Sequence, residues 1–457
     1  MDKKELEQLL TYAVSTGADF AEIYIEKSKR SKYGILDRKL DNIITTNISG
    51  IGIRIAKGEE IYYASINEPN IQKIKELIGL LLKSIEGSSI KKIKLQELQK
   101  MAPNIKIPHE KFPITKKKEF LLKIDTTVRN YSELISQVST GFVEEDRNII
   151  IANSRGIYKE TSAVYTRFIL TAYAEKDGTK AREFMDYAGG KGYELLDEVN
   201  LFEKAKETAK IAIEKLEAVD FKGGQLPVII KPGFGAVIFH EACGHGLEAT
   251  TVAPKTSIFS EDLNTKIASE KVTLIDDGTI ENGWGSSIID DEGYPTKKNV
   301  LIENGVLKKY LVDELNSKKM NQESNGCGRR EDYNYAPTSR MSNTYLAPGT
   351  DKVEDMIKSI EYGVYCERMS GGSVNPATGE FNFAVETARL IENGKLSHRI
   401  KGITLIGTSK EILKNVEMVS SDLVLGAGYC GSKSGLIPVT IGQPTIKVSS
   451  ILVGGKE

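Results

Sequence analysis

Residues 236–248 have the sequence Ala-Val-Ile-Phe-His-Glu-Ala-Cys-Gly-His-Gly-Leu-Glu. The chain contains four histidines in 457 residues, and two of them, His240 and His245, lie in this segment on either side of Glu241. Histidine pairs that share a helical face are common zinc ligands, as in the motif H-E-x-x-H. The segment therefore predicts a metal site on a helix, with its histidines five residues apart instead of four.

The five-residue spacing requires a departure from a regular α-helix. At about 100° per residue, His240 and His245 would point roughly 140° apart, too far for one tetrahedral ion. A one-residue π-bulge absorbs the extra residue, and such bulges occur mostly at functional sites. Gly244 adds little side-chain cost to a bulge at this position. We therefore predict a locally widened helix at 240–245.

A simpler alternative is a pair of core histidines on a buried helix. Residues 236–239 are apolar, so this segment is expected to be buried. A buried histidine or glutamate without a polar partner is costly. Two histidines and a glutamate on one such segment therefore favour metal binding over simple packing.

A catalytic zinc site usually has three protein ligands and one open position. The candidates for the third ligand are the many carboxylates and four cysteines, namely Cys243, Cys327, Cys366 and Cys430. Packing is the simpler explanation for Cys243, and Cys366 is expected in a strand as a small buried residue. Cys430 lies in the glycine-rich segment Gly-Ala-Gly-Tyr-Cys-Gly-Ser-Lys-Ser-Gly, which can bring a thiolate close to an ion. Cys430 is therefore the preferred candidate for the third ligand, and the other cysteines and the carboxylates stay open as alternatives.

The composition, with 40% hydrophobic and 27% charged residues, is typical of a globular protein. A formal net charge of −1 gives no electrostatic reason to expect binding to nucleic acid or to an anionic membrane. The N-terminus is charged, and no run of about 18 apolar residues predicts a membrane span. The four cysteines form no C-x-x-C pair, as is typical of a reducing compartment. These features predict a cytoplasmic protein.

The patterning predicts an α+β protein with two domains. Residues 1–218 are expected to form a layered α/β domain from two similar halves, each with the order helix, strands, hairpin, helix. A lysine-rich connector is expected at about 87–118. Residues 219–457 are expected to form a β-rich, sandwich- or barrel-like domain that carries the metal helix. Asn-Gly pairs at 304–305 and 393–394 predict type I′ hairpins in it.

Other sequence features carry no predicted chemistry. His109, in the connector, is expected to be solvated, and His398 is expected on a surface strand. Gly426-x-Gly428-x-x-Gly431 matches the dinucleotide-binding fingerprint, which requires a helix to begin directly after it. Gly435 and Pro438 interrupt any such helix, so no nucleotide cofactor is predicted.

Several separated motifs together resemble the TldD/PmbA family of metallopeptidases. They occur in the family's order along residues 220–457, whereas the N-terminal half is similar in pattern more than in motif. The motifs are the segment 233–248, Ile-Asp-Asp-Glu-Gly-Tyr-Pro-Thr (289–296), Gly-Arg-Arg (328–330) with Pro-Thr-Ser-Arg-Met-Ser-Asn-Thr (337–344), and Cys-Gly followed by Val-Thr-Ile-Gly-Gln-Pro-Thr (430–445).

The resemblance is to the TldD-type, metal-bearing subunit. It implies a zinc ion bound by His240, His245 and Cys430, with Glu241 as the general base for hydrolysis of peptide bonds. It implies that the substrates are unstructured peptides that enter an enclosed channel. It further implies a dimer with a paralogous PmbA/TldE-type subunit that lacks the metal motif, with a homodimer as the alternative.

Two points of interpretation remain open at the level of sequence. Arg340 is a candidate for contact with substrate carbonyls or carboxylates, and a structural ion pair is the alternative role. The rival function is a non-catalytic assembly or maturation factor with a structural zinc ion. A structural site is closed by a fourth protein ligand, for which Cys243 or Glu248 would serve. A non-haem iron oxygenase would instead need two histidines and a carboxylate.

Overall fold

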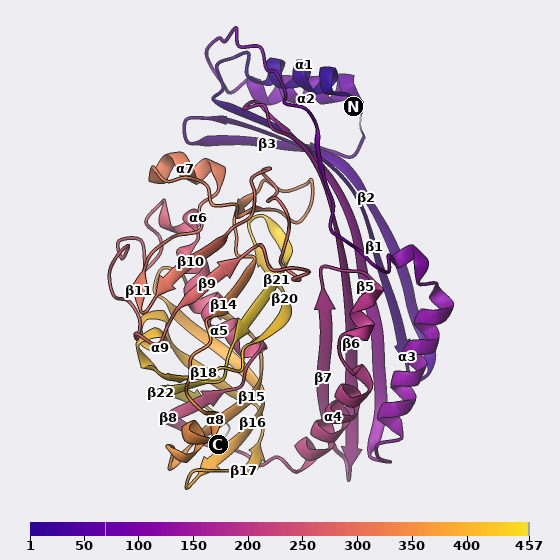
Figure 1. Cartoon of the computed structure of the whole chain (residues 1–457), viewed down its shortest axis with the longest axis vertical. Coiled ribbons are helices and arrows are strands. Elements are labelled where there is room, and N and C mark those ends of the chain that lie inside the picture. The colour runs from indigo at the N-terminus through magenta and orange to yellow at the C-terminus, as the bar shows by residue number, and fades with distance from the viewer. Residues whose placement is uncertain (69, 456–457) are drawn as a thin grey trace.

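The computed structural model describes residues 1–68 and 70–455 and has a mixed α+β fold (Figure 1). Residues up to Glu217 form a long, curved sheet with its helices. A second part, which contains two further sheets, begins at Gly223. The domain boundary that we propose at 218/219 lies between them. Within the described residues, no helix is both long and apolar enough to cross a bilayer.

The curved sheet has the strand order β3-β2-β1-β5-β6, with β7 and β4 also paired to β6. Its strands are β1 (Phe20–Leu36), β2 (Lys39–Lys57), β3 (Glu60–Ile66), β4 (Gln99–Met101), β5 (Ile135–Asn153), β6 (Tyr158–Lys176) and β7 (Thr179–Gly189). Its helices are α1 (Lys3–Ala13), α2 (Ile71–Leu82), α3 (Ile114–Arg129) and α4 (Leu201–Glu214). The element order α1-β1-β2-β3-α2 is repeated as α3-β5-β6-β7-α4, which confirms the predicted pair of similar halves.

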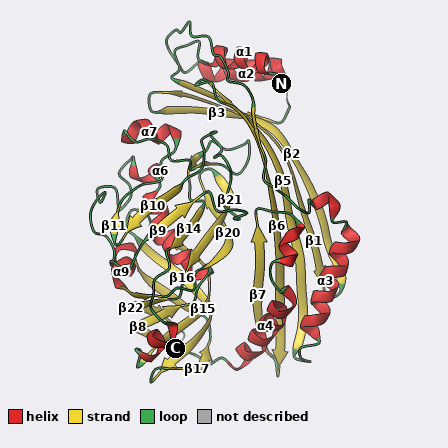
Figure 2. Cartoon of the chain, in the orientation of Figure 1, coloured by secondary structure: helices red, strands yellow, loops and turns green. Residues whose placement is uncertain are grey.

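The two halves join where β1 and β5 pair in antiparallel register from Glu22↔Asn153 to Leu36↔Ser139. Helices α1 and α2 pack at one end of the sheet, and α3 and α4 pack at the other (Figure 2).

The connector was expected to leave His109 in solvent, and this expectation was wrong. His109 is buried, with Nε2 2.8 Å from Thr166 Oγ1 and Nδ1 3.0 Å from Asp146 Oδ1.

The C-terminal part contains a closed barrel, as the predicted sandwich- or barrel-like class allows. Its strands pair in the order β15-β8-β22-β18-β16, and β16 pairs back to β15 to close the ring. They are β8 (Gly223–Ile230), β15 (Tyr362–Val374), β16 (Glu380–Glu392), β18 (Ile403–Thr408) and β22 (Ile446–Gly454), with β17 (Lys395–Ile400) and β19 (Val416–Val419) alongside. Short helices α8 (Val353–Lys358) and α9 (Ser409–Asn415) lie in the connections.

A second sheet of this part has the order β11-β10-β9-β14-β21-β20. Its strands are β9 (Leu274–Asp277), β10 (Lys298–Glu303), β11 (Val306–Leu307), β14 (Asn343–Leu346), β20 (Val424–Ser432) and β21 (Gly435–Gln443), with helix α7 (Glu314–Met320) and the small pair β12 (Gly328–Arg329) and β13 (Thr338–Ser339) nearby. Both predicted type I′ hairpins are confirmed by positive φ angles at their two turn residues, 48° and 84° at Asn304 and Gly305, and 50° and 72° at Asn393 and Gly394.

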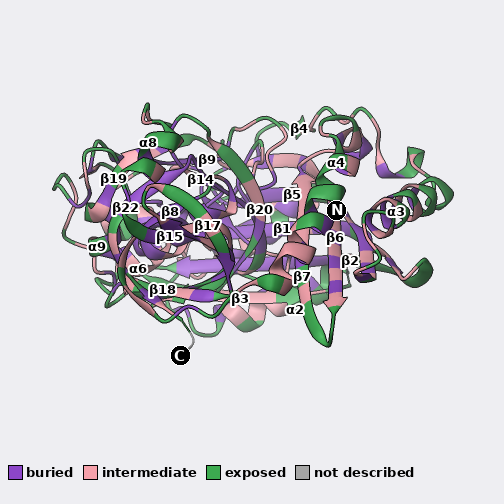
Figure 3. Cartoon of the chain, turned by 90° about the horizontal axis from the view of Figure 1, so that it is seen from below, coloured by how far each residue is buried: buried purple, intermediate pink, exposed green. Residues whose placement is uncertain are grey.

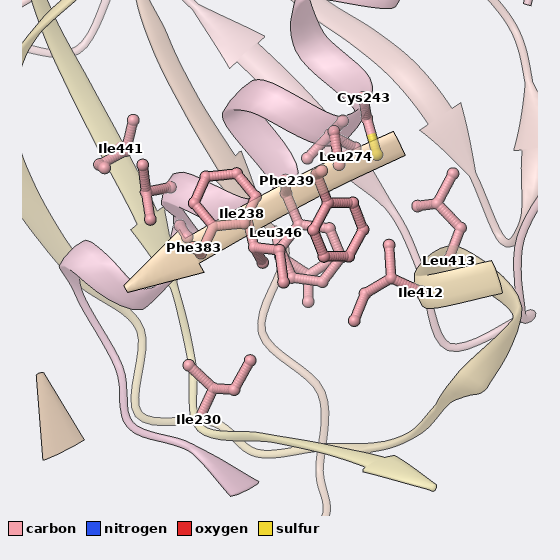
Figure 4. Packing of buried hydrophobic residues seen from close by; sticks show 14 of the residues in the cluster. Ile230, Ile238, Phe239, Cys243, Leu274, Leu346, Phe383, Ile412, Leu413 and Ile441 are labelled. Carbon is pink, nitrogen blue, oxygen red and sulfur yellow. The ribbon is translucent and has the colours of Figure 1, made fainter. Parts of the chain in front are cut away.

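One apolar core unites the barrel, the second sheet and the segment that carries the two histidines. The segment contributes Ile238, Phe239 and Cys243 to this core. They lie in one cluster with Phe383 of the barrel and Leu274 of the second sheet (Figure 4). Buried residues gather inside this part and along the long sheet, while helix surfaces and turns are exposed (Figure 3). The histidine segment is therefore held rigidly from its apolar side.

Buried ion pairs connect the long sheet to the C-terminal part. Arg54 of β2 contacts Glu22 at 2.8 Å and Glu292 at 2.7 Å, and Arg330 contacts Glu22 at 2.5 Å. All four side chains are almost completely buried. Arg330 therefore has a structural role between the two parts of the chain.

Candidate metal site

The helix that carries the two histidines is widened where the sequence predicts it. Short α5 (Val237–Phe239) continues into a π-helix over His240–Gly244, followed by a 3₁₀ turn and α6 (Ala249–Val252). The π-turn contains an extra residue, which brings both histidines to one face. The two imidazole rings lie 5.3 Å apart between centroids, at 84° to one another.

Gly244 allows this helix to approach its neighbour closely. Its φ of −54° is ordinary for a helix, so backbone freedom is not the reason for a glycine here. A Cβ at Gly244 would lie only 1.9 Å from Sδ of Met341. The segment just before β14 therefore presses directly against the π-helix. This contact was not predicted, because residues almost one hundred positions apart give no local signal of it.

The structure brings His240, His245 and Cys430 together. One ligand atom from each lies within 4.8 Å of the others, and Cys430 Sγ is 3.2 Å from His245 Nε2. Zinc bond lengths of about 2.0–2.3 Å place tetrahedral ligands about 3.3–3.6 Å apart, so small movements would complete the geometry.

The environment of His240 also fits a cation. His240 is only 2% exposed, and neither of its ring nitrogens has a hydrogen-bond partner among the described residues. Such an unpaired buried imidazole is costly unless something outside the chain satisfies it. Two imidazoles and one thiolate form a suitable ligand set for zinc.

The charges of the site favour a thiolate. Burial raises the pKa of Cys430, but the nearby His240 and His245 outweigh burial and lower this pKa to about 3. Burial lowers the pKa of His245, yet the carboxylate of Glu248 and the thiolate of Cys430 raise it well above its ordinary value. Cys430 is therefore in the form that binds metals.

Neither residue considered as a closing fourth ligand is positioned for that role. Glu248 Oε2 lies 3.0 Å from Nδ1 of His245, on the opposite side of the ring from Nε2 and Cys430. Cys243 is completely buried in the apolar core, where burial raises the pKa of its thiol. Among the described residues, the cluster therefore offers three candidate donors, and neither of these two residues adds a fourth.

Glu241 lies beside the cluster with its carboxylate partly accessible. Its side chain is 22% exposed, and Oε2 is 3.6 Å from Nε2 of His245. It therefore stands on the side of the ring that faces Cys430, whereas Glu248 stands on the other side. An accessible carboxylate in this position can accept a proton from a water at the site.

Arg340 does not point into an accessible space, as the candidate contact with substrate would require. It is completely buried, and its guanidinium donates hydrogen bonds to the Cys430 carbonyl (2.6 Å), Ser434 Oγ (2.9 Å) and the Gly435 carbonyl (3.1 Å). The structure thus favours the alternative, structural role. Arg329 is likewise buried and donates to the carbonyls of Met341 and Pro438.

The strand that carries Cys430 borders a cleft. The Gly426–Gly431 fingerprint lies within β20, which pairs with β21 as an antiparallel hairpin, so no helix follows it. In the described residues, the other edge of β20 has no strand partner. A cleft of about 660 Å³ is lined by residues 424–427 of β20, by 231–235, and by parts of β7 and β15. Its position between distant segments gave no sequence signal.

Comparisons with known proteins agree with this architecture. Three family profiles match in order: PmbA/TldA metallopeptidase domain 1 at residues 21–85, the central domain at 107–216 and the C-terminal domain at 223–455. The chain is 34% identical to a metalloprotease TldD homolog of Buchnera aphidicola, covering 89% of this chain and 86% of that protein. It is 32% identical to a metalloprotease TldD homolog of Haemophilus influenzae, covering 96% and 93%.

More distant relatives extend the comparison. A zinc metalloprotease TldD homolog of Saccharolobus solfataricus is 29% identical over 58% of this chain and 59% of that protein. The crystal structure of TldE from Thermococcus kodakarensis superposes with a TM-score of 0.76 at 23% identity, covering 99% of this chain and 100% of the other. A candidate DNA gyrase modulator from Thermotoga maritima gives 0.80 at 20% identity, covering 99% of each. The two structural likenesses show a shared fold.

Proposed function

Because the chain belongs to the PmbA/TldD metallopeptidase family, we propose that it is a zinc-dependent peptidase of the metal-bearing TldD type. In this proposal His240, His245 and Cys430 bind the ion, and Glu241 is the general base. The observation that carries the proposal is the convergence of these three donors through a π-turn that the five-residue spacing requires. The metalloprotease names of its relatives support the same conclusion.

The chain's own residues have distinct tasks in peptide hydrolysis. A zinc ion bound here supplies Lewis-acid chemistry, which acidifies water and polarises a carbonyl group. The Glu241 carboxylate takes the proton from the attacking water and delivers it to the amine as the carbon–nitrogen bond breaks. Glu248 accepts a hydrogen bond from Nδ1–H of His245, so Nε2 is the ring nitrogen that faces Cys430 and would bind the ion.

The proposed substrates are unstructured peptides in an extended conformation. The free edge of β20 offers main-chain hydrogen bonds to a peptide strand, and the strand leads to Cys430. Main-chain pairing does not depend on side chains, so it is compatible with broad sequence preference. The adjoining cleft of about 660 Å³ provides room for the peptide.

We also propose a dimer, with a paralogue that lacks the metal motif as the partner. Along residues 39–49, β2 pairs with β1, and no described strand pairs with its other edge. Ile43 and Ile44 in this stretch are 46% and 54% exposed. An exposed apolar strand edge is a typical site of association. The shared fold of TldE supports a partner of that type, and a second copy of this chain is the alternative.

The test of the proposal is peptide digestion by the purified chain, alone and with a co-purified paralogue, alongside zinc analysis. Glu241→Gln should retain zinc and lower hydrolysis by about 10²-fold or more. Cys430→Ser should lose zinc and activity, whereas Cys243→Ala, the matched cysteine control, should keep both.

Two results would contradict the proposal. Normal hydrolysis by Glu241→Gln would exclude Glu241 as the base. Stable zinc in a fully protein-ligated site, without peptide cleavage in the presence of the paralogue, would identify the structural assembly factor instead.

A further inference from the structure

We propose that Arg340 and Glu248 form a positioning pair that fixes the two halves of the metal site relative to one another. Glu248 orients His245 on the helix, and Arg340 holds the hairpin that carries Cys430. The inference rests on the proposed function, because it concerns the geometry of the proposed zinc ligands. It assigns to Arg340 and Glu248 a role in metal affinity, without contact with the substrate.

The helical half of the site is fixed by Glu248. This residue follows the 3₁₀ turn directly, is 2% exposed, and places Oε2 3.0 Å from Nδ1 of His245. A carboxylate on the far nitrogen of a ligating histidine fixes the tautomer and the ring orientation. Glu248 therefore controls where Nε2 points.

The hairpin half of the site is fixed by Arg340. Its guanidinium donates to the carbonyl of Cys430 and, across the turn, to Ser434 Oγ and the carbonyl of Gly435. The three acceptors lie in β20, in the turn and at the first residue of β21, so Arg340 spans the tip of the β20–β21 hairpin. A planar guanidinium can serve such diverging acceptors at once, whereas a lysine ammonium acts as a point charge.

Arg340 is itself held in place from several directions. Its backbone N–H donates to the carbonyl of Cys327 at 2.9 Å. The preceding Ser339 donates its N–H to Asp313 at 2.7 Å, and its Oγ accepts from the N–H of Thr250 at 3.0 Å. Thr250 belongs to α6, directly after Glu248 and Ala249. The backbone near Arg340 is thus connected to the helix as well as to the hairpin.

A short gap separates the two side chains of the pair. Nε of Arg340 lies 3.9 Å from Oε1 of Glu248, and neither atom has a hydrogen-bond partner within the described residues. Two buried, oppositely charged groups with unsatisfied atoms facing one another are poised to bond, since leaving both unpaired is costly. A movement of about 1 Å would bring them to hydrogen-bond distance.

Metal affinity and cobalt spectroscopy test the pair. The variants are Arg340→Lys, Glu248→Gln and the double variant, and zinc affinity is measured by competition with a chromophoric chelator. Each single variant should bind zinc about 10- to 100-fold more weakly. Because the two residues act on one geometry, the double variant should be no more than about threefold weaker than the weaker single variant. The absorption of bound Co²⁺, including its thiolate charge-transfer band, should shift in each.

Arg54→Lys is the matched control, because Arg54 is also a buried arginine in ion pairs but lies at the contact with the long sheet. It should leave zinc affinity and the cobalt spectrum unchanged. If Arg340→Lys fails to fold, Glu248→Gln still decides the inference through its spectrum and affinity.

The outcomes separate this inference from the proposed function. Wild-type affinity and an unchanged cobalt spectrum in the variants would overturn the positioning pair alone. Fully multiplicative losses in the double variant would show that the residues act independently and would also overturn it. Failure of the wild-type chain to bind Zn²⁺ or Co²⁺ would overturn the proposed zinc site together with the pair.

Discussion

Replacing Gly244 by alanine tests whether close packing sets the shape of the metal helix. The new Cβ would lie 1.9 Å from Sδ and 2.7 Å from Cε of Met341, which is 1% exposed. Non-bonded atoms of this kind prefer a separation of roughly 3.5–4.0 Å, so the helix and Met341 must move apart by about 2 Å. Overpacking of a buried site costs about 1–3 kcal/mol, and we expect Gly244→Ala to lower the free energy of unfolding by that amount.

The same movement should weaken metal binding. His245 follows Gly244 directly, and the π-turn that aligns it with His240 ends at Gly244. A shift of this turn separates Nε2 of His245 from the sulfur of Cys430, now 3.2 Å away. We expect zinc affinity to fall by about tenfold or more, as for other changes that reorient a ligand.

Denaturant unfolding and zinc titration of four proteins provide the assay: wild type, Gly244→Ala, Met341→Ala and the double variant. Met341→Ala alone should cost about 2–5 kcal/mol through the cavity it leaves. In the Met341→Ala variant the sulfur that would contact the new Cβ is absent. Adding Gly244→Ala to this variant should therefore leave the free energy of unfolding unchanged or raise it by up to about 1 kcal/mol. A coupling energy of about 1–4 kcal/mol is therefore expected. Additive effects, or full stability and zinc affinity in Gly244→Ala, would refute the packing argument.

The remaining predictions concern pH, a turn and metal removal. Burial raises the pKa of Glu292 from 4.5 to about 8, because it outweighs the lowering effect of the Arg54 guanidinium that contacts this carboxyl group. The folded state binds the proton of Glu292 more tightly than the unfolded state does, so protonation of Glu292 raises the free energy of unfolding. This contribution is complete below pH 4.5 and is lost as the pH rises through 8. Glu292→Gln should flatten the fall in melting temperature between pH 5 and 9, and an unchanged slope would contradict the assignment. Gly394→Ala should cost about 1–2 kcal/mol in denaturant unfolding, because φ is 72° there, whereas Gly371→Ala, in open space, should cost little. Removal of the metal by a chelator should lower the melting temperature, and added zinc should restore it. At a free zinc concentration one thousand times the dissociation constant, the stabilisation is about 4 kcal/mol. The same melting temperature with and without the chelator would argue against a bound ion.

The sequence permitted prediction wherever the deciding contacts are local. The widened helix follows from the spacing of His240 and His245 alone, because helix geometry converts sequence separation into angle. The type I′ turns follow from the Asn-Gly pairs, because these two residues adopt the positive φ angles that such a turn requires. The repeated order of elements in the N-terminal part was visible because each element carries its own periodicity.

Prediction failed or stayed open where the deciding contacts are distant. The proline- and lysine-rich surroundings of His109 suggested solvent, but Asp146 and Thr166 of two long strands bury it. Cys430 was a weak preference among the cysteines, because its approach to His245 depends on the course of β20. The role of Arg340 depends on acceptors some 90 residues further along the chain. Composition and periodicity carry no information about such approaches.

The motifs that carry the family resemblance fall into two physical groups. The segments 233–248, 337–344 and 430–445 surround the candidate metal site, where they supply its donors or pack against them. The segments 289–296 and 328–330 instead bind one another and the long sheet. Within them, Asp290 accepts from the N–H of Gly328, Asp291 accepts from the N–H of Arg330, and Glu292 pairs with Arg54.

This division has a mechanistic consequence. The first group of motifs surrounds the metal site, whereas the second group acts at the buried contact between the long sheet and the C-terminal part, where Glu292 pairs with Arg54. The residues that line the cleft beside β20 belong to neither 289–296 nor 328–330. Changes in the second group should therefore weaken the contact between the two parts of the chain and leave zinc affinity intact. Changes at 430–445 should alter both zinc affinity and peptide binding, because Cys430 and the free edge of β20 belong to one hairpin.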